Sequence, residues 1–203
     1  MHHLIYQLII ALLFFLFYLL VYSAFEEVGF EKWEAMLIVF SCVIFGWVDL
    51  PFFRYDGWII AINVGGALLP AMISTYLMIS RRISGRIVIG MVVVAYVTYH
   101  VTSVTAAGIT SSFPYWLIPP LVASMYSLLV CARSRKKAAS IAYASGTMGV
   151  LIGADILHLR ELLSMHVSKT TVASIGGAAI LDMVFLTGII AVLIDALLYG
   201  KGD

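Results

Sequence analysis

Long apolar runs are the feature that most constrains how this chain can fold. The run Leu4–Phe25 contains no charged residue, and about 20 apolar residues suffice for a helix to cross the hydrocarbon core of a bilayer. Similar runs follow along the whole chain, so that 63% of the residues are hydrophobic and only 11% are charged. A soluble domain carries about 25% charged residues. This composition excludes a soluble enzyme and a nucleic-acid-binding protein, and it predicts an integral membrane protein with the lipid bilayer as its partner.

Polar turns divide the apolar sequence into seven predicted spans. We expect an all-α fold, a polytopic transmembrane helix bundle that forms one integral membrane domain over residues 1–203. The second span is short, and the count falls to six if that segment is re-entrant. The first apolar run exceeds the 7–15 residues of a signal-peptide core and has no basic residue before it, so we expect it to be retained. The predicted spans are 4–25, 35–48, 58–80, 87–109, 115–132, 138–157 and 172–198.

The basic residues predict the orientation of the chain. Lys and Arg concentrate in the cytoplasmic loops of membrane proteins. With the amino terminus outside, nine basic residues fall on the cytoplasmic side, and only Arg54, Arg160 and Lys169 fall on the other side. We therefore expect a cell (inner) membrane protein with its amino terminus outside and its carboxyl terminus in the cytoplasm. The nine residues are Lys32, Arg81, Arg82, Arg86, Arg133, Arg135, Lys136, Lys137 and Lys201.

A short pattern occurs twice. Residues 63–67 (Asn-Val-Gly-Gly-Ala) are similar to residues 174–178 (Ser-Ile-Gly-Gly-Ala), and an acidic residue ends the span before each, Asp49 and Asp155 respectively. Glycine-interrupted helices at matching places in an internal repeat indicate the binding site of a transporter. The pattern favours a parallel repeat of a helical hairpin, and the alternative is chance recurrence in a chain with 16 Gly.

Small residues in the predicted spans indicate where helices pack closely. Lipid supplies no hydrophobic force between helices, so close backbone approach must provide their packing. Ser145, Gly149 and Gly153 recur every four residues and form one stripe. The chain also contains two Gly-Gly pairs, Gly65-Gly66 and Gly176-Gly177. We expect both pairs to lie at equal depth in the membrane, where another helix crosses.

Asp182 is the most informative polar residue. It lies ten residues into the predicted span 172–198, about 15 Å along a helix, and so near the middle of the membrane. Ser174 and Ala178 precede it on the same helix face, so we expect it to point into the bundle. Ionisable groups at that depth are costly and mark ion paths, proton relays or catalytic sites. The alternative is a protonated carboxyl that only holds two helices together.

Other polar residues are candidates for an ion or substrate path. Asp155 lies near the outer end of its predicted span, Asn63 begins the glycine-broken segment, and His100 lies in the middle of the span 87–109 with Tyr96 on the same face. We expect Asp195, one turn from the cytoplasmic end, to reach water. The His, Cys, Asp and Glu residues lack the spacing of metal ligands, so we predict neither a metal nor a cofactor.

Most of the chain resembles a known family, through residues 63–67 and Pro70 and, more specifically, through its carboxyl-terminal half. Residues 141–149 (Ile-Ala-Tyr-Ala-Ser-Gly-Thr-Met-Gly), 151–155 (Leu-Ile-Gly-Ala-Asp), 174–178 and 182–188 (Asp-Met-Val-Phe-Leu-Thr-Gly) are similar to the signature of family 1614 of the domains of unknown function. The resemblance covers about residues 36–197. It implies a multi-pass prokaryotic membrane protein and no particular activity. Ala179 stands where the family pattern has a fourth small residue, Gly.

Three functions are compatible with these residues. A small transporter, or an ion- or proton-coupled carrier for a small solute or ion, would use the buried Asp182. An intramembrane aspartyl protease would pair Asp155 with Asp182 as catalytic carboxylates, but the Gly-x-Gly-Asp and intramembrane Tyr-Asp motifs of such enzymes are missing. A membrane assembly subunit without a site of its own is the third. We favour the carrier, and the sequence leaves the oligomeric state open.

Overall fold

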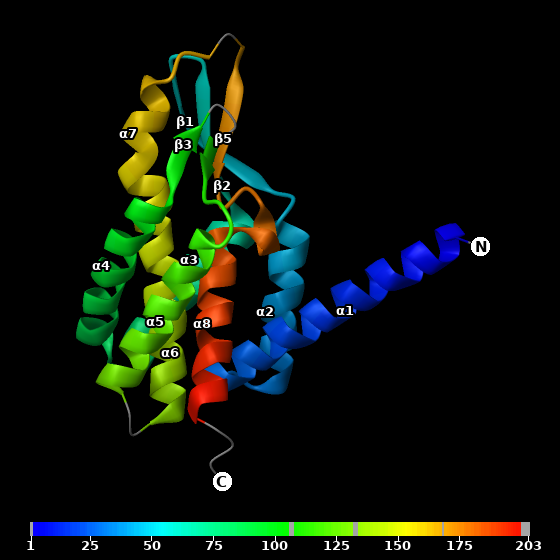
Figure 1. Cartoon of the computed structure of the whole chain (residues 1–203), viewed down its shortest axis with the longest axis vertical. Coiled ribbons are helices and arrows are strands. Elements are labelled where there is room, and N and C mark those ends of the chain that lie inside the picture. The colour runs from blue at the N-terminus through cyan, green and yellow to red at the C-terminus, as the bar shows by residue number, and fades with distance from the viewer. Residues whose placement is uncertain (1, 106–107, 132–133, 168, 200–203) are drawn as a thin grey trace.

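The chain folds into a helical bundle with a small strand region at one end (Figure 1). The computed structural model describes residues 2–105, 108–131, 134–167 and 169–199. The prediction of a mostly helical fold is confirmed. The α-helices are α1 (His2–Val28), α2 (Lys32–Phe45), α3 (Leu69–Ser80), α4 (Ser84–Val101), α5 (Ile118–Val130), α6 (Arg135–Val150), α7 (Leu157–Ser164) and α8 (Met183–Tyr199).

Short strands form where the sequence predicted the ends of spans. Strands β1 (Asp49–Tyr55), β2 (Trp58–Asn63) and β5 (Thr171–Ile175) make one sheet in the order β1-β2-β5, with β1 antiparallel and β5 parallel to β2. Strands β3 (Ser103–Thr105) and β4 (Gly108–Thr110) form a hairpin. The remaining turns are the π-helices η1 (Val64–Leu68) and η3 (Leu151–Ile156) and the 3₁₀-helices η2 (Tyr115–Leu117) and η4 (Ala179–Leu181).

Three predicted spans are therefore wrong at one end. The segments 58–63 and 171–175 are strands instead of the first turns of helices, and the span 87–109 ends as a helix at Val101. Both strand segments are short and rich in β-branched residues, and a short apolar run cannot be assigned to helix or strand by periodicity. Pairing between the two segments decides that both are strands. Although β2 and β5 are more than a hundred residues apart, they align from Trp58 opposite Thr171 to Ile62 opposite Ile175.

Helix α6 is the centre of the bundle. It packs against α3, α4, α5 and α8, and nearly all its residues from Ala138 to Val150 are buried. Small residues make this possible, because a Cβ built on Gly149 would lie 2.6 Å from Val94 Cβ of α4. A Cβ on Gly153, in the π-helical turns that continue α6 into α7, would likewise lie 2.8 Å from Thr98 Cβ. The predicted small-residue stripe thus lies against α4.

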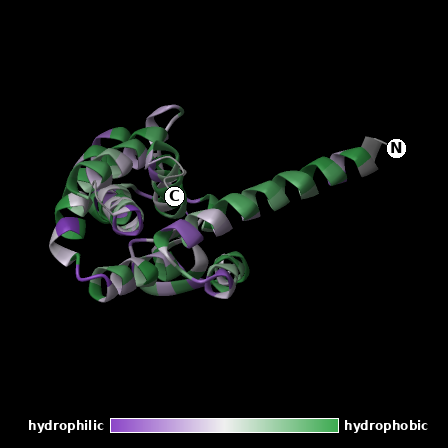
Figure 2. Cartoon of the chain, turned by 90° about the horizontal axis from the view of Figure 1, so that it is seen from below, coloured by the Kyte–Doolittle hydropathy of each residue, from purple (hydrophilic) through white to green (hydrophobic). Residues whose placement is uncertain are grey.

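Helix α1 leaves the bundle as an arm (Figures 1 and 2). Only its last turns pack, through Val21, Ala24, Phe25 and Val28, whereas Phe14 is 59% exposed. Three stretches are long and apolar enough to cross a membrane, namely Ile5–Val28, Ser84–Val101 and Arg135–Ser164 among the described residues. The other apolar helices are shorter than 18 residues.

The basic turns gather at the end of the bundle opposite the strands (Figure 1). The Arg135 guanidinium forms an ion pair of 2.7 Å with Glu27 at the end of α1. Arg81 follows α3 and donates hydrogen bonds to the carbonyl oxygens of Val28 and Gly29. Arg133 and Lys201 lie outside the described residues, as do Ala106, Ala107 and Ala132 of the predicted spans.

Candidate functional site

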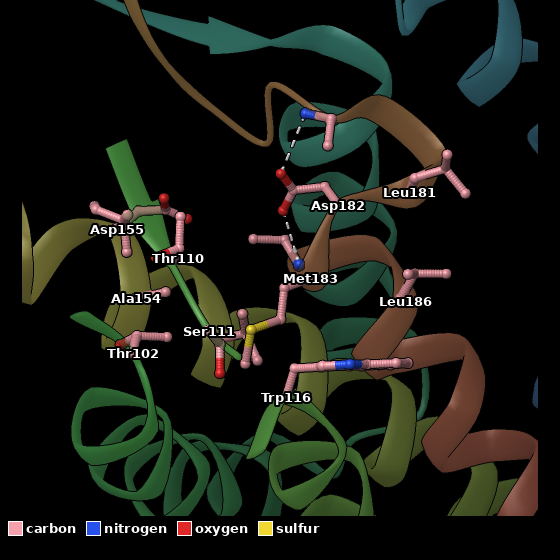
Figure 3. A pocket seen from close by; sticks show the side chains of 14 residues that line it. Thr102, Thr110, Ser111, Trp116, Ala154, Asp155, Leu181, Asp182, Met183 and Leu186 are labelled. Atoms are coloured by element: carbon pink, nitrogen blue, oxygen red, sulfur yellow. Dashed lines mark hydrogen bonds between the residues drawn. The ribbon is translucent and has the colours of Figure 1, made fainter. Parts of the chain in front are cut away.

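A cavity of about 500 Å³ lies where the helices meet the strand region (Figure 3). Its wall comes from the end of α4, the β4 segment, η2, the junction of α6 with η3, and the start of α8. The lining residues are Thr102, Ile109, Thr110, Ser111, Trp116, Val150, Ala154, Asp155, Ala178, Leu181, Asp182, Met183, Val184 and Leu186. The cavity therefore brings Asp155 and Asp182 together, although they lie on different elements.

Asp182 caps the amino terminus of α8. Its backbone is extended, with φ −70° and ψ 146°, and its carbonyl oxygen accepts the hydrogen bond of Leu186 N. Its carboxylate accepts hydrogen bonds from Val184 N (2.9 Å) and Ala178 N (3.3 Å), as Figure 3 shows. The expected position in the middle of a helix is wrong, because residues 172–182 of that predicted span form a strand and turns, and α8 begins only at Met183. The carboxylate instead binds one free N–H group of the first turn of α8, that of Val184, and the N–H of Ala178 in the preceding turn.

Asp155 has different surroundings from Asp182. It lies in η3, which widens the helix between α6 and α7. Its carboxylate makes no hydrogen bond or ion pair within the described part of the chain. Asp155 and Asp182 also line a second cavity of about 440 Å³, which extends under the sheet between β2, β5 and α7. The two carboxylates thus stand where two cavities adjoin.

Two hydroxyl groups of the first cavity already donate their hydrogens to backbone oxygens. Thr102 Oγ1 donates its hydrogen to Thr98 O (2.8 Å), and Ser111 Oγ donates to Val101 O (2.6 Å). Each hydroxyl oxygen therefore offers only lone pairs to the cavity. Neither cavity has a Lys, Arg or His among the described residues that line it. Two carboxylates without a basic neighbour make the site suited to a cation or a proton.

Asn63 and His100, the other predicted path residues, lie outside both cavities. Asn63 is buried; its amide donates to Gly46 O (2.8 Å) and Asp49 Oδ1 (3.0 Å), and its oxygen accepts from Gly66 N. His100 is near the end of α4, where it is exposed and its ring meets Tyr96 edge to face. The Asn63 side chain therefore joins the end of β2 to Gly46, Asp49 and Gly66. The expected position of His100 in the middle of a helix is wrong, because α4 ends at Val101.

The two similar glycine segments lie side by side. Each follows one of the parallel strands β2 and β5 and precedes a helix. A Cβ on Gly66 would collide with the carbonyl oxygen of Gly176, and one on Gly65 would collide with Cys42 O. Gly177 differs, because the three atoms nearest to a Cβ there all belong to Ser174 of its own turn. Close backbone contact therefore joins Gly66 to Gly176 and does not involve Gly177.

Asp49 connects the same two segments. Its Oδ1 accepts hydrogen bonds from the Asn63 amide (3.0 Å) and from Ser174 Oγ (2.5 Å). Asp49 and Asp155, which the repeat placed in equivalent positions, thus have different surroundings: one carboxylate is hydrogen-bonded between strands, and the other faces the cavities.

Two polar residues have roles that the sequence did not indicate. Asp195 is buried, not in water as expected, and accepts hydrogen bonds of 2.5 Å from both Ser124 and Ser127 of α5. His158 is also buried, with Nε2 3.2 Å from Tyr99 O and its ring stacked on Tyr99. The spacing of three residues between Ser124 and Ser127 could have indicated the burial of Asp195, but only once α5 and α8 are known to pack together.

Within the described residues, no three His, Cys, Asp or Glu side chains are grouped to hold a metal.

Comparison with known proteins identifies the family. A family model described as "Protein of unknown function (DUF1614)" matches residues 9–194. The chain belongs to this family. The match confirms the resemblance of this DUF1614 protein over about residues 36–197 and extends it toward the amino terminus. No curated protein and no solved structure matches the chain.

Proposed function

We propose that this DUF1614 protein is a multi-pass inner-membrane carrier that binds a small cation or proton in the cavity between its helices and strands. One observation carries the proposal: Asp155 and Asp182 line one cavity whose described lining contains no basic side chain. A carboxylate removed from bulk water needs a positive partner or a proton. Since the lining residues supply no positive partner, a bound cation would do so.

The outer surface of the bundle supports a membrane location. Leu129 of α5 and Leu197 of α8 are each 80% exposed, and Figure 2 shows hydrophobic residues along most of the α1 arm. Apolar surface of this extent indicates contact with lipid or with other apolar surfaces. The grouping of the basic turns at the end opposite the strands supports the proposed orientation, with that end in the cytoplasm. The cavity then lies toward the outer face.

A flux measurement tests the carrier. The full chain is reconstituted in liposomes that contain a trapped pH-sensitive dye, and gradients of Na⁺, K⁺ or choline are imposed. The carboxylates hold either a cation or a proton, so a cation that moves in one direction is exchanged for protons in the other. We therefore expect one of these cations to change the internal pH with the wild type, and not with Asp155→Asn or Asp182→Asn. Asp56→Asn is the matched control, because Asp56 lies in the β1–β2 turn at a φ of 41°, a conformation that Asn accepts.

Two results would contradict the carrier. In one, no cation changes the internal pH although the protein is correctly folded. In the other, both cavity variants transport as well as the wild type and Asp56→Asn do.

A second candidate rests on the same pair of acids. An aspartyl protease uses two carboxylates that share one proton, and Asp155 and Asp182 line a common cavity. No hydrogen bond joins the two carboxylates among the described residues, so the carrier is the better supported function. Cleavage of a transmembrane peptide by the wild type, lost in both Asp→Asn variants, would favour the protease instead.

A further inference from the structure

An aromatic side chain completes the acidic cavity. Trp116 belongs to η2, the 3₁₀ turn before α5, and is half-buried. In Figure 3 its indole is seen edge-on at one end of the cavity, with its flat face turned toward the end that carries Asp155 and Asp182. No aromatic ring from the described part of the chain stacks on it. The indole therefore lines the cavity without an aromatic neighbour.

An indole face attracts cations. The ring carries negative potential on its faces, and Trp is the strongest of the aromatic residues in binding ammonium and guanidinium groups. Proteins recognise quaternary ammonium ligands in this way. Small metal ions are different, since they require several oxygen ligands at short distances. A cavity with two carboxylates, an indole face and the sulfur of Met183 fits an organic cation better than a metal ion.

The size of the cavity agrees with this chemistry. About 500 Å³ is within the range of small-molecule sites, and is far more than one inorganic ion occupies. The adjoining cavity of about 440 Å³ is lined mainly by apolar side chains, among them Trp58, Ile60, Leu159 and Leu162. It offers space for an apolar part of the ligand beside the carboxylates.

We infer that the ligand is a small organic ammonium compound, whose charged group binds between the indole face of Trp116 and the carboxylates of Asp155 and Asp182. This inference rests on the proposed function and names the substrate class of the same site. The acids supply the charge that any cation needs, and Trp116 supplies the preference for an organic one. Trp116 is thus the residue that determines specificity.

Choline and its neutral isostere 3,3-dimethylbutan-1-ol test the inference, because the two molecules share one shape and differ in charge. Binding to the purified full chain is measured by ligand-induced thermal stabilisation, with NaCl as the inorganic probe. We expect choline to stabilise the wild type and the neutral alcohol to have no effect. Trp116→Leu should weaken choline binding about 10- to 30-fold, the effect of losing a desolvated cation–π contact, and leave the response to Na⁺ unchanged.

Trp33→Leu is the matched control, because Trp33 on α2 is 57% exposed and lies outside both cavities; it should bind choline as the wild type does. Trp116→Phe keeps an aromatic face and should lose less affinity than Trp116→Leu, and it serves as the test if the leucine variant does not fold. Equal stabilisation by the alcohol, or unchanged choline binding in Trp116→Leu, would overturn the inference. Stabilisation by Na⁺ alone, lost in Asp182→Asn, would overturn it and leave the proposed function standing. A protein that responds to no cation would contradict both.

Discussion

Asp182 has two separable roles in this structure, and three variants distinguish them. As the N-cap of α8, its carboxylate accepts hydrogen bonds at 2.9 Å and 3.3 Å from two backbone N–H groups. Replacement of an N-cap Asp by Ala costs about 1 kcal/mol, with a range of about 0.5–2. Asp182→Ala and Asp182→Leu leave both N–H groups without this acceptor, so we expect each to lower the free energy of unfolding by about 1–2 kcal/mol.

Asp182→Asn is expected to behave differently. Asn is as good an N-cap as Asp, and its side-chain oxygen can retain the shorter bond to Val184 N. It also removes the repulsion between two carboxylates that share a cavity. We therefore expect Asp182→Asn to be within about 0.5 kcal/mol of the wild type, or more stable, while cation binding is lost.

Unfolding by SDS in mixed micelles measures the free energies of these variants, and thermal stabilisation measures their cation binding. Asp56→Asn serves as the control for loss of a carboxylate outside the cavity. The reasoning is refuted if Asp182→Asn destabilises the protein as much as Asp182→Ala does. A folded Asp182→Asn variant with full cation binding would refute the functional role and leave only the helix cap.

Further expectations follow from other contacts. Gly66→Ala should destabilise the protein by about 1–3 kcal/mol in the same SDS titration, because its Cβ would meet Gly176 O; Gly85→Ala, with open space around it, should have no cost, and equal effects would contradict the close contact. Asp195→Ala should cost about 1–3 kcal/mol, since two buried serine hydroxyls lose their acceptor; a neutral effect would show that the interaction between α5 and α8 does not need it. In intact cells, Ser164→Cys should react with an impermeant maleimide and Ser84→Cys should not, and the opposite pattern would reverse the proposed orientation.

Helix positions could be predicted from the sequence where helices are long and apolar. The run Leu4–Phe25 became most of α1, and residues 138–150 became the buried part of α6. These predictions succeed because length and continuous hydrophobicity are local properties. The strands could not be predicted in this way, since β2 forms only by pairing with β5, more than a hundred residues away.

The candidate site was also predictable only in part, where its residues stand out locally in the sequence. The two acids were identified because a carboxyl group in an apolar run is unusual wherever it lies. The depth of Asp182 was misjudged, because strand and turn residues precede it where a helix was expected. Trp116 gave no signal, since an isolated Trp near the end of a predicted span is typical of the membrane interface. Only the folded arrangement places it in the same cavity as the two carboxylates.

If Asp155 and Asp182 together hold one cation, a double-mutant cycle of binding will show that their contributions are coupled. Isothermal titration of choline into the wild type, Asp155→Asn, Asp182→Asn and the double variant gives the stoichiometry and the affinities. We expect one cation per chain, a large loss of affinity in each single variant, and a double variant little worse than either, because interacting groups are not additive. Independent losses that add in the double variant, or a single variant that binds as the wild type does, would contradict this expectation.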